Sequence, residues 1–126
     1  MKTLFFLLLV LITGISCSKG TAADKDTVSP VITINSPLTG QNFTPGQTIQ
    51  ISGSVTDDKY IAEIHIHVSN TNTGALLMDV HIYPTGSSAT FDQPLTAVAG
   101  INYKIQLIAI DRAVNETVSS VEVSCN

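Results

Sequence analysis

The residues best suited to metal chemistry in this sequence are its three histidines, which lie close together in the chain. They are His65, His67 and His81. Imidazole nitrogens and carboxylate oxygens are common protein ligands of Zn²⁺ and Cu²⁺. Asp79 lies two residues before the last histidine. One hypothesis is therefore a transition-metal site formed by these four side chains; the alternative is that they are ordinary polar residues of a solvent-facing strand.

A second group of polar residues suits calcium, which binds oxygen ligands. The candidate ligands are Asp57, Asp58, Asp111 and Asn115. In a sandwich topology the two loops that carry them share one end of the domain. The alternative is that Asp and Asn close turns by hydrogen bonding their own backbone, with Lys59 and Arg112 neutralising the carboxylates.

Patterns typical of catalysis are absent from the sequence. It contains no nucleophile-elbow serine, no glycine-rich phosphate loop and no HExxH motif. We therefore predict that the protein is not an enzyme and requires no cofactor, with zinc and calcium as the alternatives above.

The elements that must position these residues are β-strands, because apolar residues alternate with polar ones almost everywhere after Pro30. Outside the first residues, no stretch has a helical period. The predicted strands span residues 31–35, 48–56, 61–69, 75–83, 89–96, 101–111 and 116–125. This pattern predicts an all-β, seven-stranded antiparallel sandwich.

The alternation also predicts which side chains share a face. Ile64, Ile66 and Val68 must face the core together with the apolar residues of 75–83, so the histidines lie on the outer face. Ile108 and Ile110 fall on that same side, which makes the face more apolar than solvation requires. The predicted partner-binding residues are His65, His67, His81, Tyr83, Ile108 and Ile110. Cover by the chain's own linker, or a slipped register, is the alternative.

The segment AGINYKIQLIAIDRAVN resembles the penultimate strand of immunoglobulin-like and fibronectin type III modules of bacterial surface proteins. These modules read G-x-x-Y-x-h-x-h-x-A-x-D-x-A-G-N, where h is apolar. The matching residues are Gly100, Tyr103, Ile105, Leu107, Ala109, Asp111, Ala113 and Asn115. Val114 departs from the usual glycine. The segment PVITINSPLTGQNFTPGQTIQISGSVTDD is similar to the opening strands of lipid-anchored Ig-like domains. The resemblance implies an Ig-like sandwich with Tyr103 as its tyrosine-corner residue.

The N-terminus is typical of a secretory signal. Lys2 precedes an apolar run, Leu4 to Ile12, that is too short to span a bilayer. Gly14, Ile15 and Ser16 then lead into Cys17, which resembles the lipobox of bacterial lipoproteins except for the glycine three places before the cysteine. That resemblance implies a diacylglycerol and fatty acyl chains such as palmitate on Cys17. Plain secretion is the alternative.

These observations divide the chain into a signal peptide (1–16), a flexible linker (17–29) and an Ig-like domain (30–126). The formal net charge of −4 argues against nucleic-acid binding. Cys125 alternates with two valines, so we expect a buried small hydrophobe; a disulfide with Cys17 is the competing interpretation.

The resulting functional prediction is a non-enzymatic Ig-like module, lipid-anchored at the outer membrane on its periplasmic or cell-surface side. Its partners would be the membrane, through the anchor, and an unknown protein or glycan. The alternative is a periplasmic metal-binding protein that uses the histidine cluster, which is formed by His65, His67 and His81.

Overall fold

The computed structural model describes residue 20 and residues 24–126; the predicted signal peptide and Cys17 lie outside the described residues. The strands are β1 (Val31–Ser36), β2 (Asn42–Phe43), β3 (Thr48–Thr56), β4 (Ile61–Asn70), β5 (Leu76–Ile82), β6 (Ser88–Thr96), β7 (Asn102–Asp111) and β8 (Glu116–Cys125). All seven predicted strands are present, each within one residue at either end. The described residues contain no helix long and apolar enough to cross a bilayer.

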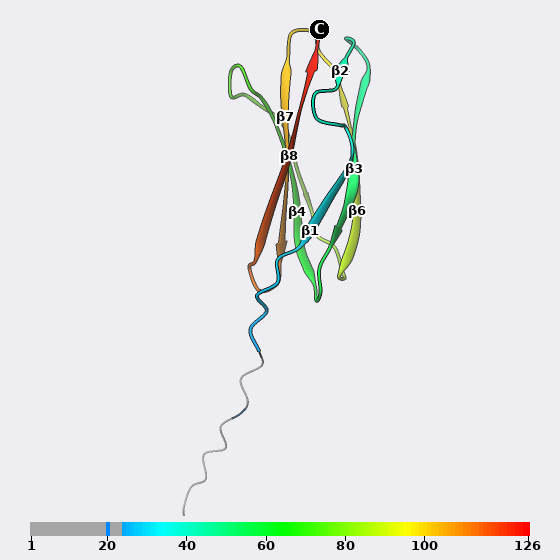
Figure 1. Cartoon of the computed structure of the whole chain (residues 1–126). Coiled ribbons are helices and arrows are strands. Elements are labelled where there is room, and N and C mark those ends of the chain that lie inside the picture. The colour runs from blue at the N-terminus through cyan, green and yellow to red at the C-terminus, as the bar shows by residue number, and fades with distance from the viewer. Residues whose placement is uncertain (1–19, 21–23) are drawn as a thin grey trace, which may run out of the picture.

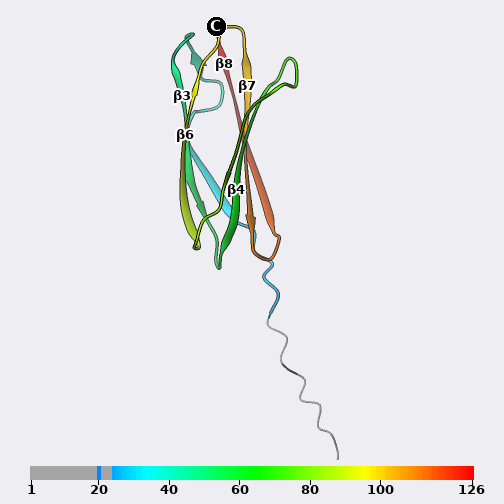
Figure 2. The same cartoon turned by 180° about the vertical axis from the view of Figure 1, so that it is seen from behind.

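The strands form two sheets that pack face to face (Figures 1 and 2). One has the order β1-β3-β6 and the other the order β2-β8-β7-β4-β5. The prediction of seven antiparallel strands missed β2, which pairs with β8 in the parallel direction. Two residues are too few to show an alternating pattern, so the sequence gives no sign of this short edge strand.

The core lies between the sheets and follows the predicted alternation. On β4, Ile64, Ile66 and Val68 are fully buried, and on β7 Ile105 and Leu107 are fully buried too. Each such side chain contributes about 1.5–3 kcal/mol through removal of its apolar surface from water. This burial fixes the strand register, because a shift by one residue would expose every one of these side chains.

Two residues that close the core at the C-terminal end have the roles expected for them. The Tyr103 side chain is 1% exposed, and its hydroxyl accepts a hydrogen bond of 2.8 Å from the backbone N–H of Val98. This is the arrangement of a tyrosine corner. Cys125 is fully buried with its thiol free, so it packs as a small hydrophobe.

Gly53 shows how closely the strands of the smaller sheet approach each other. A Cβ atom built at this position would lie 2.0 Å from the carbonyl oxygen of Thr33 and 2.6 Å from the ring of Phe91. No side chain fits there, so the glycine permits a close approach of β1 and β6 to the central strand β3. Pro94 lies on β6, an edge strand, where its missing N–H costs no hydrogen bond on the open side.

The chain enters the domain at one end, and its C-terminus lies at the other (Figure 1). At the entry end the Asn115 side-chain amide donates to the carbonyl oxygen of Asp26 at 3.1 Å, and the Thr117 hydroxyl donates to that of Pro30 at 2.6 Å. The last residues before Pro30 are therefore held against the turn between β7 and β8. The loop between β3 and β4 lies at this end too, since Arg112 N–H donates to the Tyr60 carbonyl.

Candidate functional site: the outer face of the larger sheet

The strand register brings all three histidines together on the outer face of the five-stranded sheet. His65 on β4 lies opposite His81 on β5, and His67 lies opposite Asp79. On its other side, His65 lies opposite Ile108 of β7. These pairings follow from burial of alternate residues of β4 and β7, which turns the odd-numbered positions of β4 from Glu63 onward outward.

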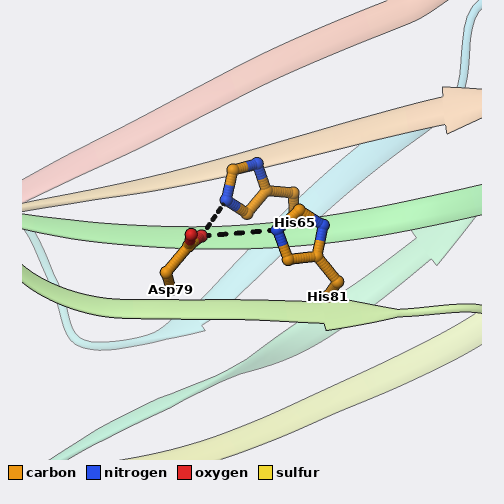
Figure 3. A group of neighbouring side chains, drawn as sticks. All are labelled: His65, Asp79 and His81. Atoms are coloured by element: carbon orange, nitrogen blue, oxygen red, sulfur yellow. Dashed lines mark hydrogen bonds and ion pairs between the residues drawn. The ribbon is translucent and has the colours of Figure 1, made fainter.

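The side chains of His65, Asp79 and His81 point toward one another (Figure 3). His65 donates a hydrogen bond from Nε2 to Asp79 Oδ1. His81 donates from Nδ1 to Glu63 Oε1, which leaves its Nε2 facing Asp79 Oδ1 at 3.5 Å. The ligand atoms of His65, Asp79 and His81 all lie within 4.8 Å of one another. This geometry brings two imidazoles and a carboxylate to one point above the sheet.

The two imidazole rings of this group also stack on each other. The ring centroids of His65 and His81 are 4.1 Å apart with an interplanar angle of 16°. Tyr83 continues the stack, with its ring 6.5 Å from that of His81 at 17°.

Asp79 is held in its ionised form by these neighbours. The hydrogen bond from His65 lowers the pKa of Asp79 from its ordinary value of 3.8, and this outweighs the opposite effect of partial burial. The charges of His65, His81 and His67 lower the pKa further. Asp79 therefore presents a carboxylate, the form that accepts hydrogen bonds and binds cations, throughout the neutral range.

His67 and Glu63 occupy different positions relative to the group of converging ligand atoms. The His67 ring packs edge-on against His65, with centroids 5.8 Å apart, and it lies outside the group of three converging ligand atoms. Glu63, which the sequence analysis did not single out, accepts a hydrogen bond from His81 and so orients its ring. Which carboxylate meets which histidine depends on side-chain rotamers across the strands, which the alternation pattern does not encode.

The apolar part of the outer face lies beside this cluster. Ile108 and Ile110 are half-buried, whereas Tyr83 is 69% exposed. Val118 lies opposite Ile108 and is 49% exposed; the sequence reasoning overlooked it. The strands have the predicted register, so a slipped register does not explain the apolar residues of this face. Residues 26–30 of the linker and domain entry contact Asn115 and Thr117 at the entry end of the domain.

The residues predicted to bind calcium separate into two groups. Asp111 is 2% exposed, and Asn115 donates to its two oxygens, from the backbone at 2.8 Å and from the side-chain amide at 2.6 Å. Burial by itself raises the pKa of Asp111, but the hydrogen bonds from Asn115 and from the backbone of Ala113 and Val114 outweigh it and lower that pKa below 3.8. Asp111 is therefore committed to closing the turn.

Asp57 and Asp58 meet a different carboxylate, that of Asp26, and these three side chains have oxygens within 4.8 Å of one another. Asp57 Oδ2 accepts hydrogen bonds from the backbone N–H groups of residues 59 and 60, at 2.9 and 2.8 Å, while its Oδ1 is buried without a partner. The four predicted ligands thus do not form one set.

The basic side chains of these loops make a different contact from the expected ion pairs with the carboxylates. The Arg112 guanidinium lies over the Tyr60 ring, 3.4 Å from its centroid. In the described part of the chain, neither Lys59 nor Arg112 forms an ion pair. A cation–π contact, not a salt bridge, occupies Arg112.

Comparison with known proteins agrees with this architecture. Residues 30–123 match the family model described as "Bacterial Ig domain". The chain belongs to this family of bacterial Ig domains. A search of the curated proteins found no match.

Two of the similar solved structures share the fold at low sequence identity. The fibronectin(III)-like modules of Clostridium thermocellum CbhA align with a TM-score of 0.51 and 22% identity, over 75% of this chain and 96% of that one. A superoxide reductase (neelaredoxin) from Ignicoccus hospitalis aligns with a TM-score of 0.52 and 16% identity, over 78% of this chain and 80% of that one. Since such a sandwich carries unrelated activities, these similarities describe the bacterial Ig domain's scaffold alone.

Proposed function

We propose that this bacterial Ig domain is a non-enzymatic binding module of the cell envelope, which recognises a protein or glycan through the outer face of its larger sheet. The observation that carries the proposal is the exposed surface formed there by Tyr83, Val118 and the histidine cluster. Stacked aromatic rings next to aliphatic side chains and a few directional polar groups are typical of binding surfaces.

Attachment to a membrane through acylated Cys17 is part of this proposal. Its support is the lipobox-like sequence that ends at Cys17, together with the full burial of Cys125, which forms no disulfide with any described residue. Two or more acyl chains give stable anchoring without a spanning helix. Residues 24–30 enter at one end of the sandwich, and the outer face of the larger sheet runs along the side of the domain (Figure 1). An anchor attached through the entry end therefore leaves this face away from the membrane surface.

Site-specific photocrosslinking in intact cells tests the binding surface. A photoreactive amino acid replaces Tyr83 in one variant and Thr90 in another; Thr90 is exposed on the outer face of the smaller sheet. A discrete crosslinked species is expected from position 83 and none from position 90. Equal crosslinking at both positions, or none at position 83, would count against the proposed surface.

The anchor is tested separately by mass spectrometry of the N-terminal peptide of the mature protein. The expected peptide begins at Cys17 and carries the mass of a diacylglycerol, and Cys17→Ser abolishes that species. A peptide with an unmodified Cys17, or with Cys17 joined to Cys125, would exclude the anchor. Protease treatment of intact cells then distinguishes the periplasmic from the cell-surface side.

A further inference from the structure

We propose that His65, Asp79 and His81 form a site for a divalent first-row transition metal, with Zn²⁺ as the reference ion and Glu63 as the residue that orients His81. The site goes beyond partner recognition by the outer face, and its test requires neither the membrane anchor nor a partner. The first observation is that two imidazole nitrogens and one carboxylate oxygen converge within 4.8 Å.

The second observation is the hydrogen bonding and orientation of the His81 ring. Its Nδ1 donates to Glu63, so in the neutral ring the lone pair of Nε2 faces Asp79 Oδ1 at 3.5 Å. Two electron-rich atoms face each other there, and either a proton on Nε2 or a metal ion between them makes the contact favourable. A histidine that donates one ring nitrogen to a carboxylate and directs the other toward a metal is the usual arrangement in zinc sites.

The spacing of these atoms also fits a small metal ion. Bonds of about 2.0–2.1 Å from zinc to nitrogen or oxygen place neighbouring ligand atoms of a tetrahedron about 3.4 Å apart. His81 Nε2 and Asp79 Oδ1 are already at 3.5 Å. His65 Nε2 has to move away from Asp79 to the same spacing, and partial exposure of the three side chains, 21%, 43% and 41%, leaves room for this adjustment.

The surrounding charges favour a cation as well. Among residues 24–126, Glu63 and Asp79 form ion pairs only with histidines. The rings of His65 and His81 lie beside these carboxylates, stacked with their centroids 4.1 Å apart. One divalent ion satisfies both imidazoles in their neutral form and offsets the two carboxylates. With three protein ligands, at least one coordination position remains open to water or to an incoming group.

The test is a zinc titration of the full chain carrying Cys17→Ser and no polyhistidine tag, in competition with a chromophoric chelator. Cys17→Ser removes a competing thiol ligand, and Cys125 is fully buried. We expect a one-to-one complex with a micromolar or lower Kd and a rise in Tm of at least about 5 °C at a hundredfold excess over Kd. Absence of saturable binding at 1:1 would overturn the proposal.

Variants identify the ligands. His65→Gln and His81→Gln should each weaken zinc binding at least about tenfold, and Glu63→Gln should weaken it about 10- to 100-fold, the usual effect of losing a carboxylate that orients a ligand. The matched control is His67→Gln, which removes the third histidine of the same face and should leave Kd within about twofold. If His81→Gln binds zinc as tightly as the parent, the proposal fails.

The role of Glu63 has its own spectroscopic readout. In the parent, ¹⁵N NMR of the His81 ring should show the proton on Nδ1 and a zinc-induced shift at Nε2. In Glu63→Gln the Nδ1-protonated form should become less dominant while the Tm of the metal-free protein stays the same. An unchanged His81 tautomer together with unchanged zinc affinity in this variant would rule out the orienting role.

Discussion

The turn between β7 and β8 and the outer face of the larger sheet contain the same kinds of polar groups, but these groups are satisfied in different ways. At the turn, both oxygens of the buried Asp111 accept hydrogen bonds from Asn115. On the outer face, within the part of the chain that the structure describes, Asp79 and Glu63 form ion pairs only with partly exposed imidazoles. The polar groups of the turn form hydrogen bonds with each other, whereas the ring nitrogens on the sheet face point toward a common position.

This difference indicates that the two regions have different roles. A carboxylate that closes its own turn stabilises the fold and has little capacity left for a ligand. Outward-pointing side chains of a strand take no part in the backbone hydrogen bonds that hold the sheet together. Their contacts can therefore be exchanged for a metal or a partner without loss of the fold. We therefore expect substitutions at the turn to change stability, and substitutions on the outer face to change binding.

The largest expected effect is that of Asp111→Ala. This change removes the buried carboxylate that accepts from the Asn115 backbone N–H and from its side-chain amide, so we expect Tm to fall by roughly 10 °C. Thermal unfolding followed by circular dichroism measures it. Asp58→Ala, which removes an exposed carboxylate of the neighbouring loop, is the control and should shift Tm by less than about 2 °C. A comparable loss in both variants would remove the distinction drawn for the turn.

Acid should weaken the same turn in the parent protein. The pKa of Asp111 is below its unfolded value, so its contribution to stability is fully present above that value, 3.8, and is lost as the pH falls through the lower folded pKa. Urea unfolding between about pH 5 and pH 2 measures this loss. Asp111→Asn should decline less steeply over the same range, and parallel pH profiles for the two proteins would contradict the assignment.

Val114→Gly should have a smaller effect of the opposite sign. Val114 has a φ of 69° and is 80% exposed, so a β-branched residue occupies a left-handed conformation where related modules have glycine. The steric cost there is about 1–2 kcal/mol, part of which is offset by the greater chain entropy of glycine when unfolded. We expect a net stabilisation of about 1 kcal/mol in urea unfolding. Destabilisation would show that the valine is not strained.

The smallest effect on stability is expected on the outer face. The double variant His65→Gln, His81→Gln removes both stacked rings but buries no unpaired group, because these side chains are partly exposed. Its Tm without added metal should remain within about 2 °C of the parent value. Differential scanning calorimetry provides the measurement. A large loss of stability would mean that the histidine cluster is structural, as the Asp111 turn is.

Much of the fold and part of the candidate site followed from alternation in the sequence. The sequence predicted seven strands, their inward residues and the shared face of the histidines. It could do so because a strand with one buried face has an apolar residue at every second position. The Ig-like resemblance around Tyr103 placed the tyrosine corner. The short strand β2 was missed because two residues leave no periodic signal, and Glu63 received no role because alternation does not encode which carboxylate meets which histidine.

By itself, the sequence determined the β-sandwich class, the outward position of His65, His67 and His81, and the end of the domain at which the aspartate loops meet, since burial of apolar residues allows one register. Only the tertiary structure decided which partners each polar group meets. It joined Asp111 to Asn115, assigned Glu63 to His81 and left His67 outside the converging group. The physical reason is that hydrogen bonds between side chains depend on rotamers and on distances across strands, which are fixed only once the whole core has packed.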